Sequence, residues 1–267
     1  MTASARVTFL GTGTSHGVPM IGCRCPTCHS SDPRDTRMRP SIYLQVEDGP
    51  SILVDTSTDL RAQALAHDVV RVDAILFTHS HADHIMGLDD VRRFNILQRA
   101  AIPAFADGRT AQDIRRTFHY IFDAPAHAAG GLPQIDLSIV EGRFDIGGRA
   151  VMPVPLLHGP RQILGYRFGS FAYLTDCNAI PDSSWPLLEG IDTMVLDALR
   201  HRPHPTHFTV AEALQAIARV RPRRALLTHI CHDLAHEETS RALPAGVALA
   251  HDGLTLDIDW PAADEAV

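Results

Sequence analysis

Residues 79–84 read His-Ser-His-Ala-Asp-His and place three imidazoles and one carboxylate within six residues. The cluster follows an apolar run that predicts a buried strand, so it would lie on the loop at the carboxyl end of that strand, where α/β sheets place their sites. Neutral imidazole and carboxylate together suit Zn, Mn or Fe. Because alternate residues can point to different sides, His79 and His81 could face one metal ion, while Asp83 and His84 face another.

Further residues of ligand type follow apolar, strand-like runs in the same way: His158, Asp176 and His229. A lone histidine or aspartate after a strand is usually a capping or surface group. Here each one repeats the arrangement of the first cluster. Together with that cluster they supply seven ligands. This number is enough for two metal ions and a bridging group.

Three cysteines lie close together near the amino end of the chain: Cys23, Cys25 and Cys28. A tetrahedral structural zinc site needs one more ligand. His232 is the best candidate, and Cys231 competes for the role. Three close thiols in a reducing compartment favour metal over a disulfide. The pattern therefore predicts a structural zinc loop at about residues 22–29.

Composition limits the class of protein. The chain has 267 residues and is 45% hydrophobic, which suits one large domain or two. Its net charge is −7 with histidines neutral. The acidic net charge argues against a protein that coats nucleic acid, because such proteins are usually strongly basic. No apolar run approaches the roughly 20 residues that span a bilayer, and no signal-peptide apolar region precedes the strand-like sequence at Val7. We expect a soluble, cytoplasmic protein that binds no membrane.

Strand-like segments come in pairs around turns, and helical segments separate the pairs. Strands are predicted at residues 7–10, 41–46, 51–54, 73–77, 102–106, 135–140, 149–154, 165–168, 171–174, 191–196, 224–227 and 254–258, and helices at residues 60–67, 89–98, 110–118 and 210–220. This alternation favours two mixed sheets with helices outside over one parallel sheet. Residues 119–134 suggest a long loop, which could be a lid or part of a dimer contact.

The motif His-x-His-x-Asp-His with its later ligands is similar to that of the metallo-β-lactamase superfamily of dinuclear hydrolases. The resemblance runs from Val7 to Ile258. It implies one domain over residues 1–267, an α/β fold built as a four-layer αββα sandwich with the metals at one edge. The first ion would be held by His79, His81 and His158. The second would be held by Asp83, His84 and His229, with Asp176 as the bridge.

The cysteine loop narrows the resemblance to phosphodiesterases of the carbon–phosphorus lyase pathway, which open a five-membered cyclic phosphate on ribose 5-phosphate. In that family a histidine near the last ligand closes the cysteine site, as His232 would here. A histidine at the place of His207 is thought to protonate the leaving oxygen, so the implied catalytic residues are Asp83 and His207. Asp55 would orient the ligand loop without binding metal. His16 and Arg161 are weaker candidates for contact with the substrate.

These features predict a metal-dependent phosphodiesterase that hydrolyses a small cyclic or nucleotide-like phosphodiester. The resemblance makes 5-phosphoribosyl 1,2-cyclic phosphate the first candidate. The implied cofactors are two divalent ions with a bridging hydroxide (Zn or Mn, with Fe as a third option) and one structural Zn. The exact substrate, the native metal and the existence of a homodimer stay open.

Three alternatives remain. A transfer-RNA 3′-processing endonuclease uses a similar ligand set but needs a protruding arm, and only 17 residues separate His158 from Asp176. The acidic balance also weakens binding to RNA. A glyoxalase-type thioesterase usually has a longer carboxyl-terminal helical extension. The last alternative is a metal-binding accessory protein without catalysis, which the full ligand set and His207 disfavour.

Overall fold

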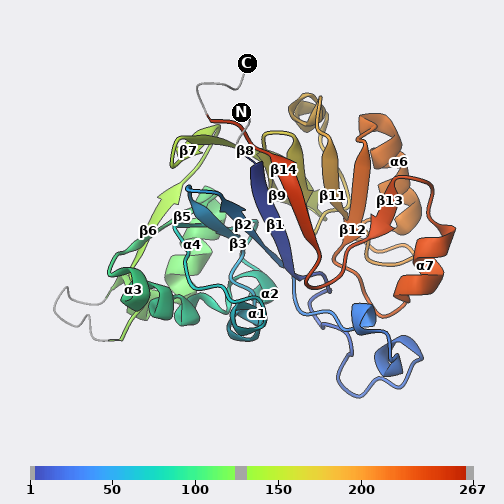
Figure 1. Ribbon diagram of the computed structural model, residues 1–267, viewed down its shortest axis with the longest axis horizontal. Helices are drawn as coiled ribbons and strands as arrows, with labels where there is room; N and C mark the ends of the chain where they lie inside the picture. Colours follow the sequence, from blue (N-terminus) through green and yellow to red (C-terminus); the bar gives the residue numbers. More distant parts are fainter. Residues whose placement is uncertain (1–3, 124–130, 263–267) are drawn as a thin grey trace.

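The computed structural model describes residues 4–123 and 131–262. Two seven-stranded sheets stack face to face, and helices cover their outer faces (Figure 1). This is the αββα sandwich that the sequence predicts.

The first sheet has the strand order β14-β1-β2-β3-β4-β5-β6 and mixes antiparallel and parallel pairs. Its strands are β1 (Ser4–Gly11), β2 (Ser41–Val46), β3 (Ser51–Val54), β4 (Ala74–Leu76), β5 (Ile102–Ala106), β6 (Ile135–Ile139) and β14 (Thr255–Asp259). The strands β2 and β3 form an antiparallel hairpin around their turn, as the sequence predicts. The strand β4 leads directly to the histidine cluster.

The second sheet has the order β13-β12-β11-β10-β9-β8-β7 and is also mixed. Its strands are β7 (Phe144–Ile146), β8 (Arg149–His158), β9 (Arg161–Phe168), β10 (Phe171–Leu174), β11 (Thr193–Asp197), β12 (Arg224–Thr228) and β13 (Val247–Leu249). The strands β10 to β13 run parallel, so β10, β11 and β12 end on one edge. That edge carries several of the predicted site residues.

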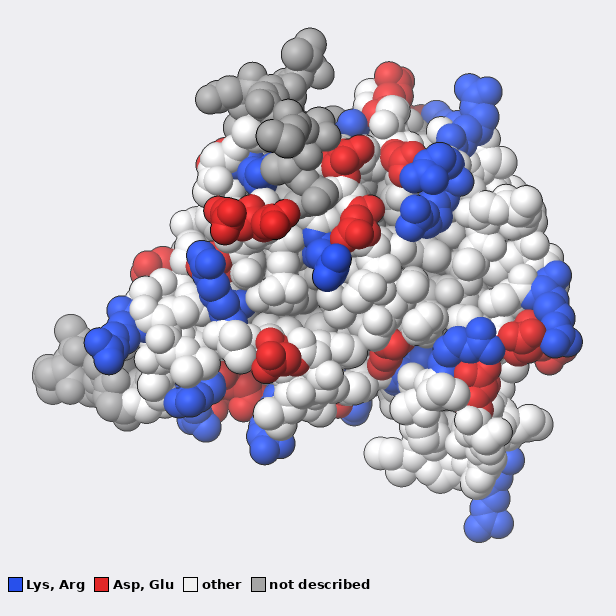
Figure 2. All heavy atoms as spheres, viewed as in Figure 1, with Lys and Arg blue, Asp and Glu red and all other residues white. Residues whose placement is uncertain are grey.

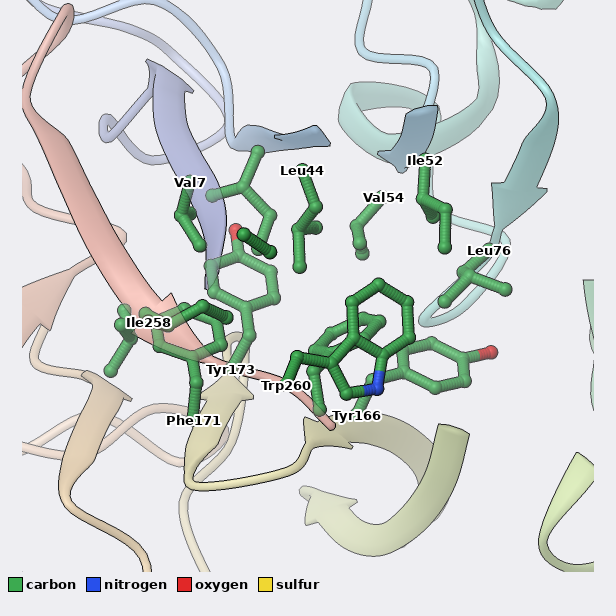
Figure 3. Close-up of a cluster of buried hydrophobic side chains, with 14 of the residues drawn as sticks. Val7, Leu44, Ile52, Val54, Leu76, Tyr166, Phe171, Tyr173, Ile258 and Trp260 are labelled. Atoms are coloured by element: carbon green, nitrogen blue, oxygen red, sulfur yellow. The ribbon is translucent and has the colours of Figure 1, made fainter. Parts of the chain in front are cut away.

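The main apolar core fills the space between the sheets. Val7 and Leu44 of the first sheet face Phe171 and Tyr173 of the second (Figure 3). All four side chains are buried, and each contributes roughly 2 kcal/mol by leaving water. Trp260, just after β14, joins this core, and its indole N–H donates to the Ala150 carbonyl at 2.8 Å. Trp260 thereby connects the first sheet, which contains β14, to β8 of the second sheet.

Helices and short 3-10 turns occupy the outer layers (Figure 1). They are α1 (Leu60–Ala66), α2 (Ala82–Ile85), α3 (Arg92–Gln98), α4 (Gly108–Thr117), α5 (His119–Phe122), α6 (Val210–Val220), α7 (His236–Ala242), η1 (Thr27–His29), η2 (Pro33–Asp35), η3 (Leu88–Val91) and η4 (Asp182–Leu188). The helix α6 has the predicted bounds, and Thr209 and Glu212 form a reciprocal capping box that fixes its start.

Some predicted elements differ from the structure. The hairpin around Gly147 and Gly148 joins β7 to β8, whereas the sequence predicts no strand between residues 135–140 and 149–154. Both glycines have positive φ, which suits a tight turn. The predicted loop 119–134 begins with α5, and its residues 124–130 lie outside the described part of the chain.

Arginine and acidic side chains are interspersed on the face shown in Figure 2, without a continuous basic surface there. Such mixing agrees with the net charge of −7. In the described ranges, none of the helices has the length and apolar character needed to span a membrane.

Candidate metal centre

Three site residues lie just after strands and have a left-handed backbone. Asp55 follows β3 with φ 64°, Asp176 follows β10 with φ 57°, and His229 follows β12 with φ 59°. A residue in this conformation turns the chain sharply, and Asp and His tolerate it better than β-branched residues do. The three turns direct polar side chains from both sheets to one edge of the sandwich.

The first group of potential ligands contains His79, His81, His158 and Asp176, with ligand atoms within 4.8 Å of one another. Nε2 of His79 lies 3.6 Å from Oδ2 of Asp176. The ring centroids of His81 and His158 are 5.0 Å apart. Side chains from distant parts of the sequence thus surround one point.

The second group contains Asp83, His84, Asp176 and His229, all of them buried. Nε2 of His84 lies 3.4 Å from Oδ2 of Asp83 and 3.3 Å from Oδ1 of Asp176. Nδ1 of His229 lies 2.6 Å from Oδ1 of Asp176. Asp176 belongs to both groups, with one carboxylate oxygen near each. The two groups match the division of ligands that the family resemblance implies.

The orphaned atoms of these side chains test whether metal ions fit here. Among the described residues, four buried atoms of the two groups make no hydrogen bond of suitable geometry, although they lie close to one another or to Asp176: His79 Nε2, His84 Nε2, Asp83 Oδ2 and His229 Nδ1. A buried polar atom without a partner costs about 1–3 kcal/mol. Divalent cations at the centre of each group would satisfy all four atoms, so the donor set fits two ions.

Burial and charge act in opposite directions on these groups. Burial disfavours the charged ring of His84, but Asp176, Asp83 and Asp55 outweigh it and raise the pKa of His84 well above its ordinary value. Burial likewise opposes ionisation of Asp176, yet His229 and His84 bring the pKa of that carboxyl well below its usual range. The carboxylate is therefore ionised, the form that binds a cation.

Hydrogen bonds orient the ligands from behind. Oδ2 of the fully buried Asp55 accepts from Nδ1 of His84 at 2.7 Å, and its two oxygens also accept from the backbone and hydroxyl of Thr78. The backbone carbonyl of Thr206 accepts from Nδ1 of His158 at 3.0 Å. Each bond leaves the opposite ring nitrogen facing the cluster. Asp55 thus lies where its predicted orienting role requires.

Arg161 lies behind the ligand loop. Its guanidinium donates to the Ser80 hydroxyl at 2.8 Å and lies 3.6 Å from Asp113. The Ser80 hydroxyl in turn donates to Asp113 at 2.6 Å. Because Ser80 lies between His79 and His81 in the chain, this network fixes the loop that carries them. The geometry favours a positioning role for Arg161 over the predicted contact with substrate.

His207 lies against both ligand groups. Its ring centroid is 4.9 Å from that of His158 and 4.8 Å from that of His229. Nδ1 of His207 donates to Oδ2 of Asp197 at 2.8 Å. The sequence analysis missed Asp197, although it ends the apolar strand β11 much as Asp176 follows β10.

The cysteine loop closes on the segment that follows β12. The thiols of Cys23, Cys25 and Cys28 lie 3.2, 3.4 and 3.6 Å from Nδ1 of His232. Four donors around one point form a closed tetrahedral set that suits zinc. Cys231 is not in this group; its sulfur accepts from the backbone N–H of Asp233. The geometry therefore favours His232 over Cys231 as the fourth ligand.

The family model that describes the beta-lactamase superfamily domain matches residues 51–230 of this sequence. This range includes the ligands from His79 to His229. The chain belongs to the β-lactamase superfamily. It is a metal-dependent hydrolase of the metallo-β-lactamase type, as the sequence analysis expects.

Solved structures similar to this chain include a diphosphatase of the PhnP family. It is 45% identical to this chain with a TM-score of 0.90, and the match covers 97% of this chain and 99% of the other. This similarity supports the resemblance to the phosphodiesterases named above.

Two curated relatives also match. The octanoyltransferase of Porphyromonas gingivalis is 35% identical over 258 residues, which is 95% of this chain but 52% of the relative, so this chain spans about half of that protein. Coenzyme PQQ synthesis protein B of a Methylobacterium species is 25% identical and covers 94% of this chain and 99% of its own length.

Proposed function

We propose that the chain is a two-metal phosphodiesterase of small substrates, with 5-phosphoribosyl 1,2-cyclic phosphate as the first candidate. The observation that carries the proposal is the shared carboxylate of Asp176, which has one oxygen in each group of ligands. The 45% identity to a diphosphatase of the PhnP family supports phosphoester chemistry. Bound divalent ions would activate water and neutralise charge that develops on the phosphate.

The chain's own residues would divide the work. The first ion would take His79, His81 and His158, and the second would take Asp83, His84 and His229. Zn and Mn suit these nitrogen and oxygen donors, and Fe is a third option. The three thiolates and His232 would hold a structural Zn.

His207 would supply the proton that the leaving oxygen needs. The carboxylate of Asp197 accepts from Nδ1, which leaves Nε2 as the atom that can donate. An alkoxide is a poor leaving group, so a positioned acid contributes about 10²–10⁴ in rate. Asp197 acts here through His207 and is a positioning residue.

A small substrate is favoured over transfer RNA. The residues between His158 and Asp176 form β9 and β10 inside the second sheet, so no RNA-gripping arm projects from this segment. We propose a single domain that acts on a small molecule without nucleic acid or a membrane. A cytoplasmic location and a homodimer stay predictions.

Hydrolysis of a substrate panel tests the proposal. Protein loaded with Mn or Zn would be given ribose 1,2-cyclic phosphate 5-phosphate, 2′,3′-cyclic nucleotides, an aryl phosphodiester, a precursor transfer RNA and a glutathione thioester. We expect turnover of the cyclic phosphates, lost in Asp83→Ala with its circular dichroism unchanged. Turnover of the RNA or the thioester alone would refute the proposed substrate class.

A further inference from the structure

A cavity of about 290 Å³ opens next to His207. It is lined by the loop after β1, including His16 and Met20, and by residues from the segments 199–207 and 231–233. Its volume lies near the lower limit of small-molecule pockets, which span about 300–1,000 Å³. The cavity therefore suits part of a small polar substrate.

The charged side chains in the cavity lining are the guanidinium groups of Arg200 and Arg202 and the carboxylate of Asp233. Asp233 already accepts from Arg202 at 2.9 Å, which leaves Arg200 without an acidic partner in the lining. A guanidinium group without an acidic partner in a concave site attracts a ligand of the opposite charge.

The Arg200 side chain is held in place before any ligand arrives. Its guanidinium donates to the backbone carbonyls of Arg202 and Pro203 at 3.1 and 3.0 Å. Its own carbonyl accepts from the N–H of Val210 at 3.0 Å, at the start of α6. Arg200 is therefore fixed relative to the segment that carries His207, and little side-chain entropy remains to be lost on binding.

Arg202 lies near the cysteine site because its partner Asp233 neighbours His232. Its partner Asp233 lies 3.7 Å from Nε2 of His232 through its other carboxylate oxygen. His232 meets the three cysteine thiols through Nδ1. The cysteine site thus lies beside the ion pair of Asp233 and Arg202 at the rim of the cavity.

The cavity lies on the leaving-group side of the proposed reaction. His207 lines the cavity and also contacts the rings of His158 and His229. A phosphodiester held between the two ligand groups, with its leaving oxygen at His207, would direct the leaving part of the substrate into this cavity.

We propose that Arg200 and Arg202 are specificity residues that bind a second anionic group, a phosphate monoester, on the leaving part of the substrate. This inference rests on the proposed phosphodiesterase function. Arg200 makes the main contact, and Arg202 contributes from the rim. A phosphodiester without the second anionic group uses the same metal ligands but gains nothing from the cavity.

The test compares two substrates that differ only in this group: ribose 1,2-cyclic phosphate with and without its 5-phosphate. We expect wild-type kcat/KM to favour the 5-phosphate, because charge-assisted hydrogen bonds are worth about tenfold to hundredfold in binding. Arg200→Gln lowers kcat/KM for the 5-phosphate ester more than for the unphosphorylated ester and so removes most of this preference. Arg202→Gln has a smaller effect in the same direction.

Arg223→Gln is the matched control for Arg202→Gln. Arg223 forms an exposed ion pair with Asp192, comparable to the pair of Arg202 with Asp233, but lies outside the cavity lining. Equal wild-type rates for the two esters, or an equal loss on both in Arg200→Gln, would overturn this inference and leave the phosphodiesterase proposal intact. Absence of turnover of any phosphodiester by metal-loaded wild type would overturn both.

Discussion

Nδ1 of His207 lies 2.8 Å from Oδ2 of Asp197, and the carboxylate of Asp197 is fully buried at the end of β11. A carboxylate in this place holds the ring in one tautomer and one orientation. The pair thereby links a strand of the second sheet to the point where we expect the leaving oxygen.

Replacing Asp197 with Asn should lower kcat by about 10²-fold for a phosphodiester with an alkyl leaving group, because His207 then loses its fixed tautomer. A 4-nitrophenyl ester should lose much less, since 4-nitrophenoxide leaves without a proton. Rates for both esters with the same metal content would check this. Asp192→Asn, at an exposed ion pair, is the control. An equal loss on both esters would contradict a role for Asp197 in proton donation.

Removing the guanidinium of Arg161 should weaken metal binding. Arg161→Met breaks its bond to Ser80, and loss of a group that orients ligands costs about 10–100-fold in metal affinity. Competition with a chelator would measure the change. Arg116→Met is the control, because Arg116 pairs with the same Asp113 but its side chain is 81% exposed. Unchanged affinity in Arg161→Met would show that the ligand loop needs no such support.

The cysteine site should hold its own ion independently of the other ligands. Cys28→Ser should lose one equivalent of zinc and retain the rest, since its sulfur lies 3.6 Å from Nδ1 of His232 and away from the other two groups. Trypsin should then cleave faster after Arg24 in the released loop. Cys231→Ser should keep all the zinc. Loss of zinc from the Cys231 variant alone would identify Cys231 as the fourth ligand.

Stability should fall in mild acid because of His236. Burial, with Arg34 and Arg37, lowers the pKa of His236 from 6.5 to about 4. Between these pH values the unfolded chain takes up a proton that the folded ring does not, so the free energy of unfolding decreases as pH falls through this window, by at most about 3 kcal/mol. Urea unfolding at pH 7 and pH 4.5 measures the slope of the free energy of unfolding against pH.

The variant His236→Gln should show a smaller loss between these two pH values than wild type does. The exposed His119→Gln should keep the wild-type slope. Identical slopes in all three proteins would exclude His236 as the source.

The sequence singles out the residues that the structure brings together in the two groups, because their signal is local. Residues 79–84 are dense in imidazole, and each later ligand follows an apolar strand. The supporting contacts are different, since Arg161 meets Ser80 across 81 positions and no local pattern marks such a pair. Short elements also escape prediction: β13 has three residues, too few for a period to appear, and its parallel pairing with β12 is a tertiary contact.

The central claim is that two ions share the carboxylate of Asp176 and that both are needed for phosphodiester hydrolysis. Chelated protein should be titrated with Mn while hydrolysis of an aryl phosphodiester and bound metal are both measured, with zinc retained in the cysteine site. We predict that activity rises with the second equivalent of Mn and that Asp176→Asn stays inactive. Full activity at one equivalent, or in Asp176→Asn, would contradict the two-metal account.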